Sequence, residues 1–287
     1  MEEWIEGARG PEGSLLGSLR TALRRMREGL WAPSAAECLT CKGQIKGTSF
    51  RLGEASDNPL GLCPACFASI PWITRVVCPT CGRAEDCPDC RRGYPRDFVI
   101  NRSAVRYDPL MKEWLAAFKY RGDERYARVI GTMLHQAYEL MKEALPDPEI
   151  RFDAVTFVPV SEERLLERGF NQAELASAEL ARCLRLPARS LLLRTHATAK
   201  QSQKTRNARF FDLRKAFALD EAEAQRLLEE RHSPSKKTRN NDNRDTCEPL
   251  RLLLIDDVYT TGSTMQECSS VLYERLGAEV YGLTWAR

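Results

Sequence analysis

The hydrophobic pattern changes along the chain and divides it into three parts. Residues 14–31 place leucines and a methionine on one helical stripe with arginines elsewhere, which predicts an amphipathic basic helix. From Cys38 to Cys90 there is little periodicity and much glycine and proline. After Tyr94, apolar runs of strand length alternate with helical patterns. We therefore expect an N-terminal extension (1–37), a small domain (38–95) and a large domain (96–287).

The large domain is predicted to be α/β. Strands alternating with helices imply right-handed crossovers and a mainly parallel sheet, with ligands bound at the carboxyl ends of the strands. The segment 231–246 has no apolar residue and is expected to be a disordered insertion. The expected strands are 99–107, 153–160, 188–194, 250–256 and 278–285, and the expected helices are 109–119, 123–144, 171–184 and 264–276.

Composition adds only weak limits. The 287 residues are 43% hydrophobic, and 43 Lys+Arg against 40 Asp+Glu give a net charge of +3, too small to indicate nucleic-acid binding by itself. No secretory signal is visible, and no apolar run approaches the ~20 residues of a membrane span. We expect a cytosolic protein. For the helix at 14–31, packing on the protein's own body is favoured over binding to a partner or to the inner membrane surface.

Eight of the 11 cysteines form four C-x-x-C pairs. Without a secretion signal the chain is expected in a reducing compartment, where such pairs bind metal more often than they form disulfides. Eight thiolates match two closed, structural zinc sites, and sequential and interleaved pairing are both open. Cys183, Cys247 and Cys268 are interpreted as small core residues rather than nucleophiles. The predicted ligands are Cys38, Cys41, Cys63, Cys66, Cys78, Cys81, Cys87 and Cys90.

The stretch LLLIDDVYTTGST (252–264) carries the clearest chemistry. An apolar strand ends in Asp256 and Asp257, and a turn follows whose backbone N–H groups and hydroxyls can surround a phosphate. No lysine follows the glycine, so this is not a Walker-type loop. Carboxylates only accept hydrogen bonds, so a ligand with hydroxyls beside its phosphate fits, such as a ribose 5-phosphate. The alternative is a capping box from Thr264 to Glu267, which leaves the two aspartates unexplained.

IDDVYTTGST resembles the signature of type I phosphoribosyltransferases. The resemblance implies that Asp256 and Asp257 hold the ribose hydroxyls of phosphoribosyl pyrophosphate, which binds with Mg²⁺. Purine-salvage members carry an aspartate base where this chain has Thr260, so a purine salvage reaction is not expected. The 5-phosphate would be held by Thr260, Thr261, Gly262, Ser263 and Thr264.

The wider pattern resembles the ComF family of bacterial competence proteins over roughly residues 38–287. It comprises the C-x-x-C pairs, AFKYRGD (117–123), VPVSEERLLERGFNQAELA (158–176), RTHATAKQ (194–201), KAF (215–217) and IDDVYTTGST. This resemblance implies a double zinc ribbon followed by a type I phosphoribosyltransferase-like domain. It also implies a role in handling single-stranded DNA during natural transformation, with competence-machinery proteins as partners.

Two further loops enter through the resemblance. Arg164 and Arg168 are candidates for the loop that meets pyrophosphate, although pairing with nearby glutamates on a solvated turn is the alternative. Gln201 and Arg209 match a mobile loop between Arg194 and Phe217.

Cations and rings are interleaved after the last cysteines, a pattern that suits single-stranded DNA. An ordinary half-buried strand and helix explain it equally well. The residues are Arg91, Arg92, Tyr94, Arg96, Phe98, Arg102, Tyr107, Phe118, Lys119, Tyr120 and Arg121.

Three functions remain open from the residues. The first is a ComF-type factor that binds phosphoribosyl pyrophosphate and single-stranded DNA. The second is a working phosphoribosyltransferase with an unknown acceptor. The third is a zinc-dependent interaction module whose sugar-phosphate site is regulatory.

Overall fold

A computed structural model describes residues 37–45, 60–91, 96–121, 125–147, 149–195, 216–232 and 248–287. Its strands are β1 (Phe98–Val105), β2 (Ala154–Phe157), β3 (Leu192–Arg194), β4 (Phe217–Leu219), β5 (Arg251–Val258) and β6 (Glu279–Ala286). Its helices are α2 (Pro64–Ala68), α3 (Pro88–Arg91), α4 (Pro109–Arg121), α5 (Arg125–Ala144), α6 (Glu162–Arg168), α7 (Gln172–Leu184), α9 (Glu221–His232) and α11 (Ser263–Leu276).

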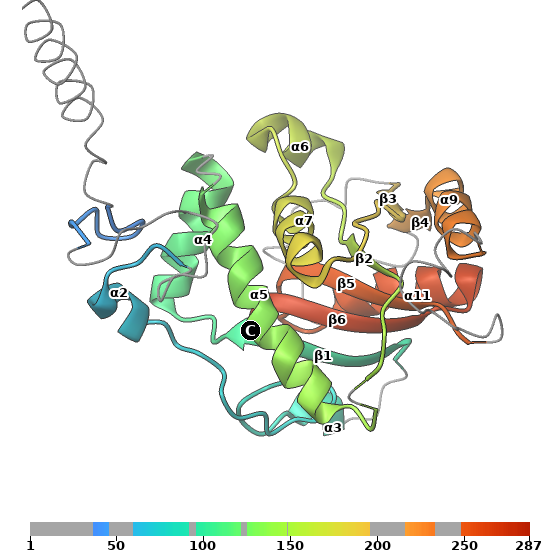
Figure 1. Cartoon of the computed structure of the whole chain (residues 1–287), viewed down its shortest axis with the longest axis horizontal. Coiled ribbons are helices and arrows are strands. Elements are labelled where there is room, and N and C mark those ends of the chain that lie inside the picture. The colour runs from blue at the N-terminus through green and yellow to red at the C-terminus, as the bar shows by residue number, and fades with distance from the viewer. Residues whose placement is uncertain are drawn as a thin grey trace, which may run out of the picture.

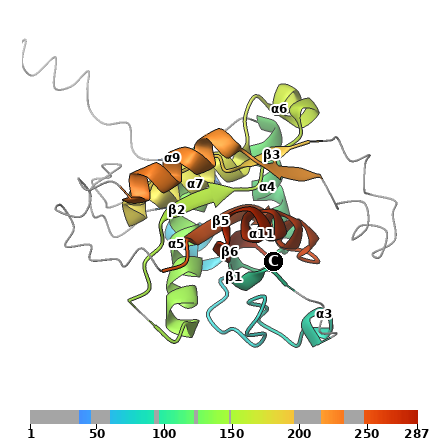
Figure 2. The same ribbon diagram turned by 90° about the vertical axis from the view of Figure 1, so that its right-hand side faces the viewer.

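The central sheet has four parallel strands in the order β1-β6-β5-β2. Figure 2 shows them from β2 at the top to β1 at the bottom, with α9 above β2 and α3 below β1. In Figure 1, α5 crosses in front of β1 and β6. The predicted α/β class with a mainly parallel sheet flanked by helices is confirmed.

The sheet separates two hydrophobic cores. Along β5, Leu253 and Ile255 belong to the core with α5 and α7, whereas Leu252 and Leu254 belong to the core with α11. Alternate residues of a strand point to opposite faces, so four consecutive apolar residues are needed where both faces are covered. This explains why β5 is an uninterrupted apolar run.

The cysteine-rich segment packs along β1, the outer strand of this sheet. Ile73 N–H donates to Ala104 O at 2.9 Å, and Asn101 N–H donates to Thr80 O at 2.8 Å. Gly82 lies so close to β1 that a Cβ there would sit 2.7 Å from Asn101 O, and its φ is +74°. These contacts cover an edge that would otherwise expose unpaired backbone groups.

Several elements differ from the predictions. The strand expected at 188–194 is shorter, and β3 pairs with β4 in a separate antiparallel sheet. The turn expected around Arg164 is the helix α6, because Ser161 caps it at one end and Gly169, with φ of 81°, ends it. Helix α9 was not predicted and extends to His232, so the first two residues of the expected insertion at 231–246 are helical.

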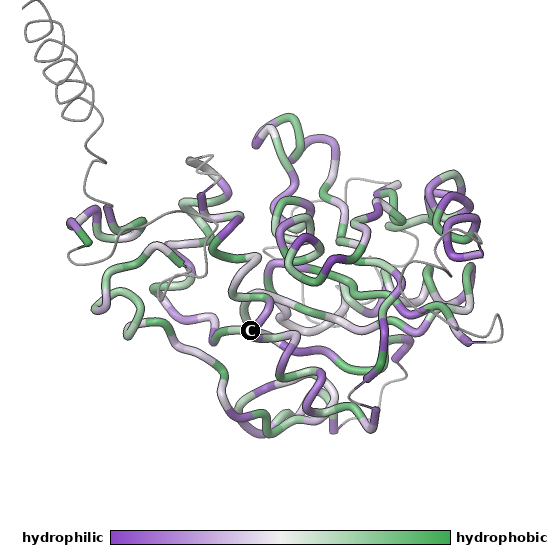
Figure 3. Tube along the Cα trace, viewed as in Figure 1, coloured by the Kyte–Doolittle hydropathy of each residue, from purple (hydrophilic) through white to green (hydrophobic). Residues whose placement is uncertain are grey.

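Figure 3 shows why α9 was missed: most of it is hydrophilic. Only Ala224 and Leu227 are buried among its residues, so the helix has almost no apolar stripe. The predicted helix at 14–31, the mobile-loop residues Gln201 and Arg209, and residues 233–247 lie outside the described residues. Among the helices that the structure describes, none is long and apolar enough to cross a membrane.

Candidate functional site

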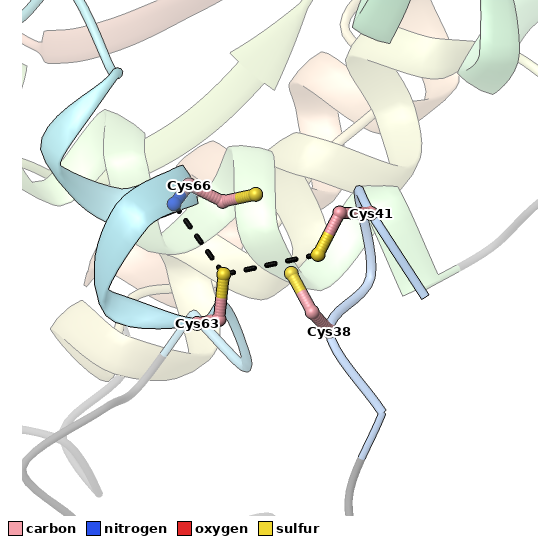
Figure 4. A group of neighbouring side chains, drawn as sticks. All are labelled: Cys38, Cys41, Cys63 and Cys66. Atoms are coloured by element: carbon pink, nitrogen blue, oxygen red, sulfur yellow. Dashed lines mark hydrogen bonds between the residues drawn. The ribbon is translucent and has the colours of Figure 1, made fainter. Parts of the chain in front are cut away.

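The first group of cysteines brings four sulfurs together from two C-x-x-C turns (Figure 4). All four Sγ atoms lie within 4.8 Å of one another, and those of Cys41 and Cys63 are 3.8 Å apart. Cys63 caps α2, and its sulfur accepts from the N–H of Cys66 at 3.5 Å. The group consists of Cys38, Cys41, Cys63 and Cys66.

The second group has the same form and lies against β1. Its sulfurs are also within 4.8 Å of one another, with Cys81 and Cys87 at 3.6 Å. Both groups join cysteines that follow one another along the chain, so the structure has the sequential pairing. The group consists of Cys78, Cys81, Cys87 and Cys90.

Both groups fit zinc. With Zn–S bonds near 2.3 Å, tetrahedral zinc spaces its sulfurs about 3.8 Å apart, as found here. Burial acts to raise the pKa of Cys38, but N–H groups of Cys63, Cys41 and Thr40 outweigh it and lower that pKa to about 6. These N–H groups would stabilise the thiolate of Cys38, which is the form that binds metal. Burial and the neighbouring sulfurs instead raise the pKa of Cys66, so the fit to zinc rests on the sulfur spacing. Each group could hold one zinc ion, closed by four sulfurs, so the metal would supply structure rather than a reactive water.

Two arginines surround the second group. Arg102 is 2% exposed, and its Nη1 donates to Pro79 O and Asn101 O. Burial lowers the pKa of Arg102, and the charges of Cys78 and Cys81 oppose that shift. A positive group here offsets the negative charge of a four-thiolate site.

Arg287 forms the second contact. Its Nη2 lies 3.7 Å from Cys87 Sγ, and its guanidinium stands 4.4 Å from the centroid of the Tyr259 ring. Tyr259 begins the loop that follows β5. The second cysteine group is therefore joined by contact to the predicted phosphate loop.

Asp256 and Asp257 stand at the carboxyl end of β5, as the sequence predicts. Asp257 forms an ion pair with Lys119 of α4, on the face of Leu253 and Ile255. Burial acts to raise the pKa of Asp257, but Lys119 outweighs it and holds that pKa below its usual value. The opposite is true of Asp256, because burial, aided by the charge of Asp257, raises its pKa to about 8.

The loop after β5 is shaped by one glycine. Gly262 has φ of 83°, and a Cβ on it would lie 2.1 Å from the Tyr259 hydroxyl. It is also the N-cap of α11, so its backbone position sets where the first N–H groups of that helix point. Thr261 and Ser263 face each other, with their hydroxyl oxygens 3.0 Å apart. The capping box considered for Thr264 is absent, since α11 already begins at Ser263 and Gly262 provides no side-chain cap.

Cations from two other elements reach the same end of the sheet. Arg168 of α6 donates to Gln172 at 3.0 Å, and its charge helps to lower the pKa of Asp257. Burial lowers the pKa of Arg194 of β3, and the charge of Arg164 lowers it further, while Asp256 opposes the shift. The two arginines predicted for the pyrophosphate loop are thus within electrostatic reach of the aspartates or of Arg194. The sequence does not indicate that Lys119 and Arg194 belong to this site, although they lie in the motifs AFKYRGD (117–123) and RTHATAKQ (194–201).

The described members of the cation and ring series expected for DNA do not form one surface. Arg102, Phe98 and Phe118 are 2%, 5% and 1% exposed, because β1 and α4 turn those side chains into the protein. Lys119 instead pairs with Asp257. Arg92 and Tyr94 are outside the described residues. Among the lone cysteines, Cys268 is buried as expected, but Cys183 is exposed on α7.

The two cysteine groups predict two zinc ions per chain. Purified protein should release about two zinc equivalents on thiol modification, measured with a colorimetric chelator. Cys78→Ser with Cys81→Ser should retain one, because the first group is built from other turns. Cys183→Ser, at an exposed position, is the control and should leave two zinc equivalents. One equivalent in the unaltered chain would contradict a double site.

The raised pKa of Asp256 predicts a pH dependence of stability. Its carboxyl group binds a proton more tightly in the folded chain (pKa about 8) than in the unfolded chain (near 3.8). Stability should therefore fall as pH rises from about 4 to 8, and most of this loss should vanish in Asp256→Asn. Melting temperatures at pH 6 and pH 8 measure it. An equal change in melting temperature between the two pH values for the unaltered chain and Asp256→Asn would contradict the raised pKa of Asp256. Asp86→Asn, at an exposed position, is the control and should behave like the unaltered chain.

Comparison with known proteins identifies the family of this chain. No protein-family model matches it. It is 33% identical over 248 residues to Competence protein ComFC of Bacillus subtilis, which covers 83% of this chain and 89% of that protein. It is 26% identical over 261 residues to Competence protein F of Haemophilus influenzae (87% of this chain, 96% of the relative) and 26% identical over 227 residues to DNA utilization protein YhgH of Salmonella typhi (77% and 87%). Identity at this level across most of both chains, with two four-cysteine groups ahead of a parallel sheet, shows that the chain belongs to the ComF family of competence proteins.

Proposed function

We propose that this protein acts in DNA uptake, binding phosphoribosyl pyrophosphate with Mg²⁺ at the end of β5 and engaging single-stranded DNA. The names of its relatives, competence proteins and DNA utilization proteins, support the role in DNA uptake. The main observation in support of this ligand is the pair of carboxyl groups beside the loop shaped by Gly262. Asp256 and Asp257 would accept hydrogen bonds from ribose hydroxyls, and the loop from Thr260 to Thr264 would bind the 5-phosphate.

The cations at this end of the sheet support a pyrophosphate-bearing ligand. Asp257 and Lys119 are already paired, so the ribose hydroxyls have to enter beside that pair. Arg168 and Arg164 of α6 are within electrostatic reach of Asp257 and of Arg194, respectively, and an arginine can pair with phosphate oxygens in a bidentate manner. Mg²⁺ would neutralise the remaining phosphate charge. From the sequence pattern alone, we propose that Gln201 and Arg209 also lie near the bound ligand.

A second candidate is an active phosphoribosyltransferase. The arginines of α6 would stabilise a pyrophosphate leaving group, which favours this reading. Thr260 opposes it, because a threonine hydroxyl with its ordinary pKa cannot act as a general base. Release of pyrophosphate across a panel of bases, amines and DNA tests this candidate, and no release across the panel would reject it.

Binding of phosphoribosyl pyrophosphate can be tested by calorimetry with Mg²⁺. Asp256→Asn with Asp257→Asn should weaken binding by at least roughly 10–100-fold, since one hydrogen bond to a charged group contributes ~1.5–3 kcal/mol and the ionised Asp257 would provide at least one. Glu139→Gln with Glu143→Gln, at exposed positions of α5, removes the same charge and should leave binding unchanged. Equal affinity in the two double variants, or no binding by the unaltered chain, would reject the ligand assignment.

DNA binding should depend strongly on salt. Fluorescence anisotropy with a labelled oligothymidylate should show log affinity falling linearly with log salt, by ~0.7 for each phosphate contacted on a single strand. A duplex of the same length should bind more weakly, because its bases cannot stack on side chains. A flat salt response, or preference for the duplex, would remove single-stranded DNA from the proposal.

A further inference from the structure

A cleft lies between the second cysteine group and the carboxyl end of the sheet, next to the sugar-phosphate site. Its volume is ≈ 260 Å³. One wall is the turn Arg83–Glu85 of the cysteine-rich segment, and another is Arg106 and Tyr107 after β1. The floor is formed by residues 258–260 and Arg287, at the ends of β5 and β6. Thr260 lines the cleft and also belongs to the predicted phosphate loop, so the cleft opens beside that loop.

The cleft is positively charged. The side chains of Arg83, Arg106 and Arg287 line it, and Glu85 is the one acidic side chain among the lining residues. Asp89 lies 3.9 Å from Arg83, so that arginine is partly compensated. Arg106 is exposed. The excess of guanidinium groups favours an anionic ligand.

Arg287 has hydrogen-bond capacity that the protein leaves unused. Nη2 is directed to Cys87 Sγ, but Nε and Nη1 are buried and have no acceptor among the described residues. The stacking on Tyr259 explains where the guanidinium lies, but it satisfies neither N–H group. Buried polar groups in folded proteins are normally hydrogen-bonded, so two adjacent unpaired donors on a basic cleft indicate a missing acceptor.

Tyr107 adds an aromatic surface next to the cations. Its ring is only partly buried, and its backbone is fixed because its N–H donates to Arg287 O at 2.7 Å. Proteins that bind single nucleotides of a strand combine backbone cations with rings on which bases stack. Ligand pockets typically measure roughly 300–1,000 Å³, so a cleft of ≈ 260 Å³ accommodates one small unit rather than a long ligand.

We propose that this cleft binds a nucleotide phosphate, with Arg106 and Arg287 on the phosphate and Tyr107 against the base. The nucleotide is either a free nucleoside monophosphate or one unit of a DNA strand. The second source rests on the proposed function, and the first does not. In both cases the zinc-loaded cysteine turn would hold Arg83 and Arg287 in place.

The full zinc-loaded chain should be titrated with thymidine monophosphate by calorimetry and with labelled oligothymidylate by anisotropy. Arg106→Gln should weaken binding about 5–10-fold, and Glu85→Gln should strengthen it about 2–3-fold, since it removes the opposing charge. Both residues are exposed, so neither change should disturb the fold. Arg128→Gln, an exposed arginine on α5, is the matched control and should have no effect.

Shifts in opposite directions by Arg106→Gln and Glu85→Gln support the cleft, because damage to the fold cannot strengthen binding. Effects on the mononucleotide identify a free ligand, and effects on the oligomer alone identify a strand. If Arg106→Gln matches Arg128→Gln with both probes, or if the unaltered chain binds neither, the proposal is overturned. Phosphoribosyl pyrophosphate titrated into the same samples shows separately whether the sugar-phosphate site is intact.

Discussion

Two neighbouring carboxylates at the end of one buried strand are the constraint around which the carboxyl end of the sheet is organised. Consecutive strand residues point to opposite faces, so Asp257 follows the face of α5 and α7, whereas Asp256 follows that of α11. Each face then supplies a cation. Lys119 of α4 pairs with Asp257, and Arg194 of β3 lies within electrostatic reach of Asp256. Segments far apart in sequence must therefore meet here.

The cysteine-rich segment depends on the same end of the sheet. Its buried apolar residues, among them Leu39, Leu62 and Ile70, join the core on the side of α5. Its two sulfur groups extend the two cores, the first on the side of α5 and the second on the side of α11. The second group continues through Arg287 and Tyr259 to Gly262. A side chain at Gly262 would collide with Tyr259, so the ring that carries Arg287 also fixes the loop at the start of α11. The second four-cysteine group and the loop before α11 are thus parts of one packed unit.

The sequence predicts those parts of this structure that have local signals. Apolar runs such as 252–255 and the C-x-x-C spacing indicate the strand and the sulfur groups directly. Helix α9 lacks an apolar stripe, so the sequence does not indicate it, and the exposed leucines of α6 give no periodic face, so the sequence indicates a turn there. The sequence pattern groups Lys119 with the candidate DNA-binding cations, because nothing near it in sequence shows that α4 directs it to Asp257. Contacts between distant segments carry no local signal, which is why the cleft beside Thr260 emerged only from the structure.

The Lys119–Asp257 pair also bears on which ligand suits the site. Ribose 5-phosphate would bring hydroxyls to a carboxylate that already has a partner, and nothing in that ligand would replace Asp257 beside the lysine. In the proposed complex, phosphoribosyl pyrophosphate would bring additional anionic oxygens next to the ribose, and Lys119 and the arginines of α6 could contact them while the hydroxyls engage the aspartates beside the Lys119–Asp257 pair. In the proposed complex this would favour the complete pyrophosphate donor over the simple sugar phosphate, while Thr260, which is no general base, would leave the site better equipped to hold the donor than to activate an acceptor.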